Sequence, residues 1–213
     1  MTLLRLPLTR DRILAAALAY ADREGLTALS MRKVGAELGV EAMSLYNHIA
    51  NKAEIVAGIT DLVAAEIALP GPDFDWKGQM RARSASAHAV LMKHPWAVSQ
   101  FMEQTAPGPH MMTYLDATLG CLMAVGFTPL QADTARVTID NHIYGFTRQR
   151  LTRPQRTREI AREAKRELKS LPAQGFSSLR RRAEALAVAK PEEINDFEFG
   201  LDLILDGLDR LTR

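Results

Sequence analysis

Apolar residues recur every three or four positions along most of this chain, which is the spacing of one face of an α-helix. The first run predicts a helix that Thr9 can cap and that Gly25 can end. Further helices are predicted over 51–67, 76–93, 110–125 and 129–150, with a last helix from Pro191 or Glu192. No segment has the alternating pattern of a strand. The pattern therefore predicts an all-α protein.

The most informative pattern lies in residues 30–52, which predict two short helices folded over a turn at Gly39 and the start of a third. Glycine adopts positive φ at such a turn without steric cost, and Gly35 is small enough to let two helices cross closely. The inward positions have helix-turn-helix spacing: Val34, Leu38, Val40, Leu45 and Ile49. The outward positions after the turn form a compact, weakly charged surface: Ala42, Met43, Ser44, Tyr46, Asn47 and His48. That surface suits a recognition helix in a DNA major groove, although an ordinary helical hairpin has the same pattern.

The flanks of this unit favour the DNA-binding interpretation. A helix precedes it, which makes a three-helix domain, and Asn51 with Glu54 has the pattern of a capping box at the start of the next helix. The N-terminus of that helix, with Lys52, suits a phosphate, although Lys52 is also explained as a solvated lysine. We therefore expect Arg32 and Lys52 to contact phosphates, and the outward surface to contact the groove.

The N-terminal motifs resemble those of the TetR family of transcriptional regulators. The resemblance rests on the order of the segments 25–30, 31–34 and 38–40, and above all on Leu45-Tyr46-Asn47-His48 followed by Asn51-Lys52. In the C-terminal part, the segment 124–127 and the tail 197–208 are similar to the regulatory domain of tetracycline repressors. The resemblance implies an N-terminal helix-turn-helix DNA-binding domain, a larger C-terminal helical domain for ligand binding and dimerisation, and a homodimer that binds a DNA operator.

Two prolines and a glycine in residues 70–75 mark the predicted boundary between these domains. The DNA-binding domain is predicted over 1–70, and the effector-binding and dimerisation domain over 71–213.

Charge is unevenly distributed along the chain. The formal net charge is only +2, but residues 147–190 hold thirteen Lys and Arg against four Glu. Because Pro154, Pro172 and Gly175 interrupt this block, we interpret it as a solvated, partly mobile connector with broken helices, not as a nucleic-acid site. The last 23 residues are acidic, so the basic block can also pair with them or with a partner subunit.

Other functional classes find little support in the sequence. No apolar run is long enough to span a membrane, and the first ten residues are too interrupted for a signal peptide. The single cysteine, Cys121, is expected to pack in the core, and the cytoplasm is the expected location. No phosphate-binding, dinucleotide-binding or hydrolase motif is present, and the histidines have no zinc-binding spacing. Neither an enzyme nor a metal nor a cofactor is predicted.

Helical bundles form ligand pockets from inward side chains between helices. The predicted effector-binding residues are Met92, Phe101, Met102, Leu115, Asn141, His142 and Gln149. The apolar members are equally explained as core. Asn141 and His142 lie in the otherwise apolar stretch 137–146, and a buried polar group there would need a ligand, a water or a subunit contact as its partner.

The likeness to tetracycline repressors breaks down at residues that matter for their drug, which they bind as a magnesium chelate. Alignment on the Gly-Phe pair puts Met102 at a metal-ligating histidine, Gln149 at the carboxylate and Asn141 at another histidine. Methionine is not a ligand for a hard cation such as magnesium. We therefore expect a metal-free organic effector in a mainly apolar cavity.

The expected function is that of a ligand-responsive repressor, whose partners are a palindromic double-stranded DNA operator and a small organic effector. The helices near 129–150 and 192–212 are predicted to form a four-helix bundle in a homodimer. In the last helix, apolar residues follow one line at Ile194, Phe197, Leu201, Ile204, Leu208 and Leu211. Others lie off that line, at Phe199, Leu203 and Leu205, so more than one face is expected to be buried. An activator on the same fold, or a helical ligand-binding protein without DNA binding, has the same sequence pattern.

Overall fold

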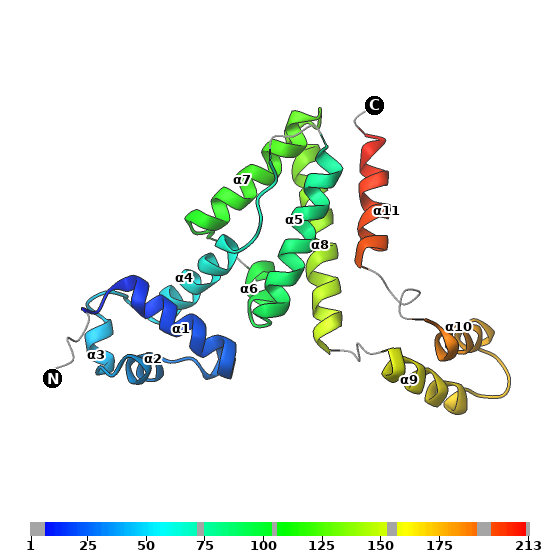
Figure 1. Cartoon of the computed structure of the whole chain (residues 1–213), viewed down its shortest axis with the longest axis horizontal. Helices are drawn as coiled ribbons and strands as arrows, with labels where there is room; N and C mark the ends of the chain where they lie inside the picture. Colours follow the sequence, from blue (N-terminus) through cyan, green and yellow to red (C-terminus); the bar gives the residue numbers. More distant parts are fainter. Residues whose placement is uncertain (1–6, 72–74, 104–105, 153–156, 191–196, 212–213) are drawn as a thin grey trace.

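The structure, a computed structural model, describes residues 7–71, 75–103, 106–152, 157–190 and 197–211. These residues form helices joined by loops and contain no strand, which confirms the all-α prediction (Figure 1). No helix in these ranges is long and apolar enough to cross a membrane.

The helices form two groups along the chain. The first group is α1 (Arg10–Glu24), a 3₁₀ turn (Leu26–Ala28), α2 (Met31–Leu38), α3 (Ala42–Leu45) and α4 (Lys52–Ala65). The second group is α5 (Trp76–Lys93), α6 (Ala97–Glu103), α7 (Pro109–Ala124), α8 (Pro129–Thr152), α9 (Thr157–Ser170), α10 (Ser177–Val188) and α11 (Phe197–Asp209). The predicted start of the last helix, at residue 191 or 192, lies outside the described residues.

Side-chain caps begin the N-terminal helices where the sequence predicts them. Thr9 Oγ1 accepts a hydrogen bond from the backbone N–H of Arg12 at 3.3 Å, and Asn51 Oδ1 accepts one from Glu54 at 2.9 Å. The Glu54 carboxylate reaches back and accepts from the N–H of Ala50 at 2.8 Å. The capping box at the start of α4 is thereby confirmed.

Helix α4 belongs to two hydrophobic cores at once. Ile55 and Ile59 pack in the N-terminal core with α1, α2 and α3, whereas Val63 and Ala64 pack in the larger C-terminal core. A tilt of α4 therefore moves side chains in both cores, because close-packed interiors resist voids.

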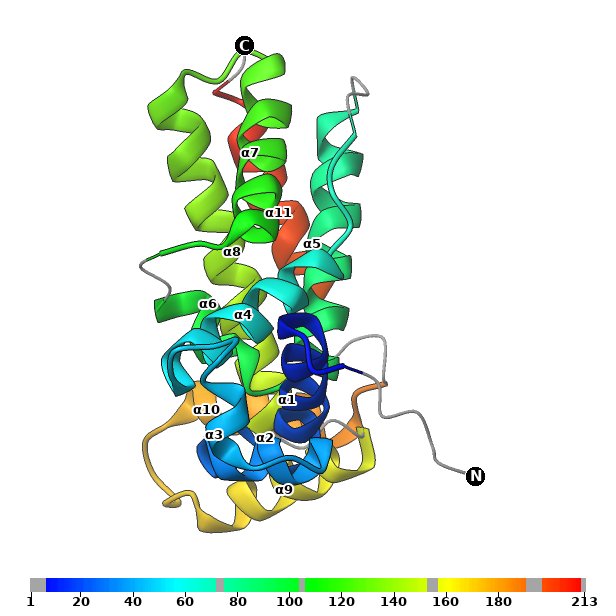
Figure 2. The same ribbon diagram turned by 90° about the vertical axis from the view of Figure 1, so that its left-hand side faces the viewer.

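The long helices of the second group stand above the small N-terminal group in Figure 2. Helix α8 is central: it packs against α5, α6, α7 and α11, while α7 also packs on α4. Cys121 lies buried on α7, as expected. This arrangement sets α6, α7 and α8 around a common space directly next to α4.

Residues 157–188 are helical on either side of Pro172 and Gly175, as the predicted broken helices require, but they pack together instead of forming a solvated connector. They form two helices, α9 and α10, which pack on each other through Ala164 and Ala183, both buried. Small and apolar residues recur at helical spacing on one side of α9, but the many charged residues between them obscured this pattern in the sequence. Figure 1 places the pair beyond the end of α8, on the far side of the molecule from α1–α3.

The buried apolar line of α11 differs from the predicted one. Phe197, Leu201 and Leu205 form the line that is buried against the chain itself, although Leu205 was expected off it. Phe199 and Leu203 lie on the other side of the helix and are 67% and 62% exposed. Within one chain, only one face of α11 is covered.

Candidate functional site

The helix-turn-helix of α2 and α3 turns at Gly39, whose φ of 65° is in the left-handed region. A β-carbon at Gly35 would lie 2.9 Å from the carbonyl oxygen of Val40, so glycine is required for α2 to approach the turn this closely. Leu45 and Ile49 are fully buried below the turn. These contacts fix the outward residues of the unit relative to the N-terminal core.

The predicted groove residues lie on the solvent side of this unit. Met43, Tyr46, Asn47 and His48 are exposed, and Ala42 and Ser44 are partly exposed. Arg32 and Lys52, at the starts of α2 and α4, are exposed as well. The surface therefore presents hydrogen-bonding side chains together with two cations, which is what groove and phosphate contacts require.

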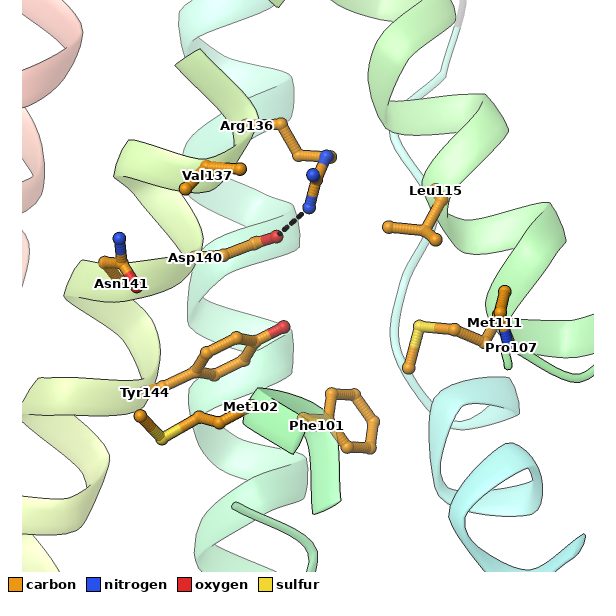
Figure 3. Close-up of a pocket in the computed structure, with 10 residues that line it drawn as sticks. All are labelled: Phe101, Met102, Pro107, Met111, Leu115, Arg136, Val137, Asp140, Asn141 and Tyr144. Atoms are coloured by element: carbon orange, nitrogen blue, oxygen red, sulfur yellow. Dashed lines mark hydrogen bonds and ion pairs between the residues drawn. The ribbon is translucent and has the colours of Figure 1, made fainter. Parts of the chain in front are cut away.

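A second candidate site is a cavity of about 330 Å³ between α6, α7 and α8. This volume falls in the range of small-molecule pockets. Figure 3 shows the residues that line it: Phe101, Met102, Pro107, Met111, Leu115, Arg136, Val137, Asp140, Asn141 and Tyr144.

Four of the seven predicted effector residues line this cavity: Phe101, Met102, Leu115 and Asn141. His142 does not, because its Nε2 donates to the carbonyl oxygen of Phe197 at 2.9 Å and its ring stacks on the Phe197 ring. Met92 and Gln149 are also absent from the lining. Asn141 is exposed at the rim, so the premise that it is a buried polar group was wrong, and the partner of His142 is a backbone carbonyl of α11.

The charged wall of the cavity was missed by the sequence analysis. Arg136, Asp140 and Tyr144 stand four residues apart on α8 and project toward α7 in Figure 3. Arg136 Nη1 donates to Asp140 Oδ2 at 3.0 Å. The sequence holds a signal for this wall, because positions 136, 140 and 144 form one line along a helix. That line lies beside the fully buried line of Ala135 and Ile139. The cavity is therefore more polar than expected.

Behind this wall lies a buried arginine. Arg83 on α5 is 1% exposed, and its Nη2 donates to Asp140 Oδ1 at 2.5 Å. Its guanidinium carbon sits 4.5 Å from the centre of the Tyr114 ring, a cation–π contact. Burial raises the pKa of Tyr114 and of Tyr144, so both hydroxyls stay protonated at neutral pH.

The cavity is connected to α4 through the N-terminus of α7. Asp61 on α4 is buried, and its carboxylate accepts hydrogen bonds from the N–H groups of Met111 (2.9 Å) and His110 (3.3 Å). A β-carbon at Gly108 would collide with this carboxylate, so glycine there lets the two helices meet. Because Met111 also lines the cavity, one residue joins the space between the helices to α4.

A second connection between the two groups of helices centres on His94, which is 1% exposed. Its Nδ1 lies 2.7 Å from Asp22 Oδ1 on α1, and its Nε2 lies 3.3 Å from Glu66 Oε1, just after α4. Trp96 donates to the same Asp22 oxygen at 2.8 Å. Helices α1 and α4 are thus tied to the loop before α6.

The residues of the cavity do not fit a magnesium chelate. Both oxygens of its carboxylate, Asp140, accept from guanidinium groups, whose positive charge next to Asp140 opposes the binding of a hard cation there. Met102 offers only a thioether. No group of three or more His, Cys, Asp and Glu suited to a metal ion occurs among the described residues.

Two family profiles match the chain. "Bacterial regulatory proteins, tetR family" matches residues 13–59, and "Tetracyclin repressor-like, C-terminal domain" matches residues 69–212. The chain belongs to the TetR family. The family consists of DNA-binding transcriptional regulators that respond to ligands, and the helix-turn-helix surface and the cavity described above lie within the two matched regions.

Relatives of this TetR-family regulator match nearly its whole length. The HTH-type transcriptional repressor DrrR1 of Streptomyces coeruleorubidus is 30% identical over 96% of this chain and 78% of its own. The class A tetracycline repressor of Escherichia coli is 28% identical over 93% of this chain and 89% of its own. The crystal structure of the Streptomyces coelicolor TetR family protein ActR in complex with actinorhodin has a TM-score of 0.82 at 29% identity, covering 97% of this chain and 99% of that one.

Proposed function

We propose that this regulator is a repressor that binds a palindromic operator as a homodimer and is released by a small organic effector bound between α6, α7 and α8. A division of the chain near residue 70 into a DNA-binding part and an effector-binding part belongs to this proposal. The relatives named as repressors, and the complex of ActR with a small molecule, support the class.

The observation that carries the proposal is the shared helix α4. At one end it packs with the helix-turn-helix core, and near its other end Asp61 holds the N-terminus of α7, whose Met111 lines the cavity. An effector that displaces Met111 would move Asp61 and tilt α4 with it. Ligand and DNA would then favour different positions of α4, which is the differential binding that coupling between two sites requires.

The uncovered face of α11 supports a homodimer. Phe199 and Leu203 are exposed there, and a second copy related by a two-fold axis would cover them. The axis would present the two helix-turn-helix surfaces of the dimer to successive major grooves, about 34–36 Å apart. A palindromic DNA site has the same two-fold symmetry.

The test is fluorescence anisotropy with labelled DNA from upstream of the protein's own gene, against unrelated DNA of equal length. We expect tighter binding to the upstream DNA, and loss of that preference in the double variant Tyr46→Ala, Asn47→Ala. Equal affinity for both DNAs would favour a ligand-binding protein without DNA binding. A reporter gene behind the same DNA separates repressor from activator, since only a repressor lowers its expression.

A further inference from the structure

The cavity between α6, α7 and α8 offers a ligand more hydrogen-bond donors than acceptors. Its one carboxylate, Asp140, is already engaged, because Oδ1 accepts from Arg83 and Oδ2 accepts from Arg136. Asp133, which also binds Arg136, is 57% exposed and does not line the cavity. The charge of the wall's carboxylate is therefore already balanced by two guanidinium groups.

Donors remain in excess on the same wall. Arg136 has five N–H groups, and the structure engages three of them, at Nε, Nη1 and Nη2. The Tyr144 hydroxyl points into the cavity in Figure 3 and makes no hydrogen bond within the described part of the chain. Its raised pKa keeps it protonated and able to donate.

The layer behind the wall adds to this excess. Nε and Nη1 of Arg83 and the hydroxyl of Tyr114 are buried without a partner among the described residues. These groups do not line the cavity themselves, but they place further donors, and no further carboxylate, directly behind its wall. Charge points the same way: the side chains of Arg83 and Arg136 are 0% and 20% exposed, and only one comparably buried carboxylate, Asp140, stands against them.

We infer that the effector carries an anionic group, a carboxylate or an ionised phenol, that binds Arg136 and Tyr144, attached to an apolar ring system that packs on α6 and α7. This inference rests on the proposed function, since it specifies the ligand of the same pocket. The ring system fits the remaining lining, in which Phe101, Met111 and Leu115 face the charged wall. Thioethers and aromatic edges both favour contact with rings. A cationic effector is disfavoured, because Asp140 is neutralised and Arg136 repels it.

The test compares two probes of nearly equal shape, 2-anthracenecarboxylate and 2-anthracenecarboxamide, by fluorescence titration of the full chain at about pH 7.5, where the acid is ionised. We expect the acid to bind at least about tenfold more tightly than the amide, as a charge-assisted hydrogen bond predicts. Arg136→Gln should remove this preference, and Arg136→Lys, which keeps the charge, should retain part of it. Arg148→Gln, an exposed position on the same helix, is the matched control and should bind like the wild type.

Equal binding of acid and amide, full preference in Arg136→Gln, or no binding of either probe would each overturn the inference. Circular dichroism of each variant ensures that a loss of binding is not a loss of fold. Binding to the upstream DNA is measured on the same preparations. If that DNA is bound but the acid is not preferred, the ligand class is wrong and the repressor proposal stands. If the acid is preferred but the DNA is not bound, the proposed function fails instead.

Discussion

In the proposed DNA complex, Lys52 and Tyr46 would contribute to binding in physically different ways. Lys52 is an exposed cation at the capped start of α4, where free amides already favour a phosphate. Tyr46 follows α3 directly, is 46% exposed and can contact bases or the backbone in the groove. The first interaction is insensitive to DNA sequence, and the second depends on the groove.

Lys52→Ala should therefore weaken binding to specific and unrelated DNA to a similar extent and reduce the salt dependence by about one phosphate contact, a slope change of about 0.9. Tyr46→Ala should mainly reduce the preference for the upstream DNA. Anisotropy titrations at several salt concentrations measure both effects. Lys165→Ala, an exposed lysine of α9, serves as the control. An unchanged slope in Lys52→Ala would argue against a phosphate contact there.

His88 on α5 shows how a single titratable group makes stability depend on pH. Thr147 Oγ1 donates its proton to the carbonyl oxygen of Ile143 at 2.6 Å, so it can only accept from His88 Nδ1, 2.8 Å away. The ring also stacks on Phe197. Burial, with the nearby Arg150 and His142, lowers the pKa of His88 below its ordinary value of about 6.5. The folded state thus holds this imidazole neutral.

Below about pH 6.5 the unfolded chain takes up a proton that folded His88 resists, so the free energy of unfolding should fall as the pH decreases toward the folded pKa. His88→Gln keeps an N–H donor but does not titrate. Its loss of stability between about pH 7.5 and 5.5 should be smaller than that of the wild type in urea unfolding. His110→Gln, an exposed histidine, is the comparison. Parallel pH curves for wild type and His88→Gln would exclude His88 as the cause.

At the scale of helices, contacts between residues close together in the sequence were predictable, whereas contacts between residues far apart in it were not. Thr128 and Gln131 cap the start of α8 through reciprocal bonds of 2.9 and 3.3 Å, which depend on residues three apart and were predictable from sequence. The Arg83–Asp140 pair joins residues 57 positions apart and depends on how α5 meets α8. The turn at Gly39 and the exposure of the residues that follow it were therefore anticipated, whereas the charged wall of the cavity was not.

The contact between α4 and α7 gives a prediction at this scale. Asp61→Ala removes two acceptors from the first turn of α7 and should lower the free energy of unfolding by about 1–2 kcal/mol, as the loss of a helix cap does. Asp61→Asn, which keeps one acceptor oxygen, should cost less. Asp116→Ala on the exposed side of α7 is the matched control, and urea unfolding measures all three. If Asp61→Ala were as stable as Asp116→Ala, Asp61 would not join the two helices.

At the scale of the whole molecule, the proposed homodimer depends on the apolar faces left uncovered on α8 and α11. Val137 and Leu130 of α8 are 40% and 83% exposed, and Phe199 and Leu203 of α11 are more than half exposed. Leu201, by contrast, is fully buried within the chain. An arginine at Leu201 would therefore disrupt the fold of the monomer, whereas an arginine at Leu203 would place a charge on the proposed surface between subunits.

Leu203→Arg should leave the helical content unchanged but convert a dimer into a monomer, because burying an unpaired charge in an apolar interface is strongly unfavourable. Light scattering after gel filtration at micromolar concentration measures the mass directly. Met43→Arg, which adds the same charge at an exposed apolar residue of α3, should remain dimeric. Two linked helix-turn-helix surfaces bind a palindromic operator far more tightly than one surface does. Monomeric Leu203→Arg should therefore also lose most of its affinity for the upstream DNA. A wild-type protein that is monomeric at this concentration, or a Leu203→Arg variant that stays dimeric, would mean that α11 does not form the interface.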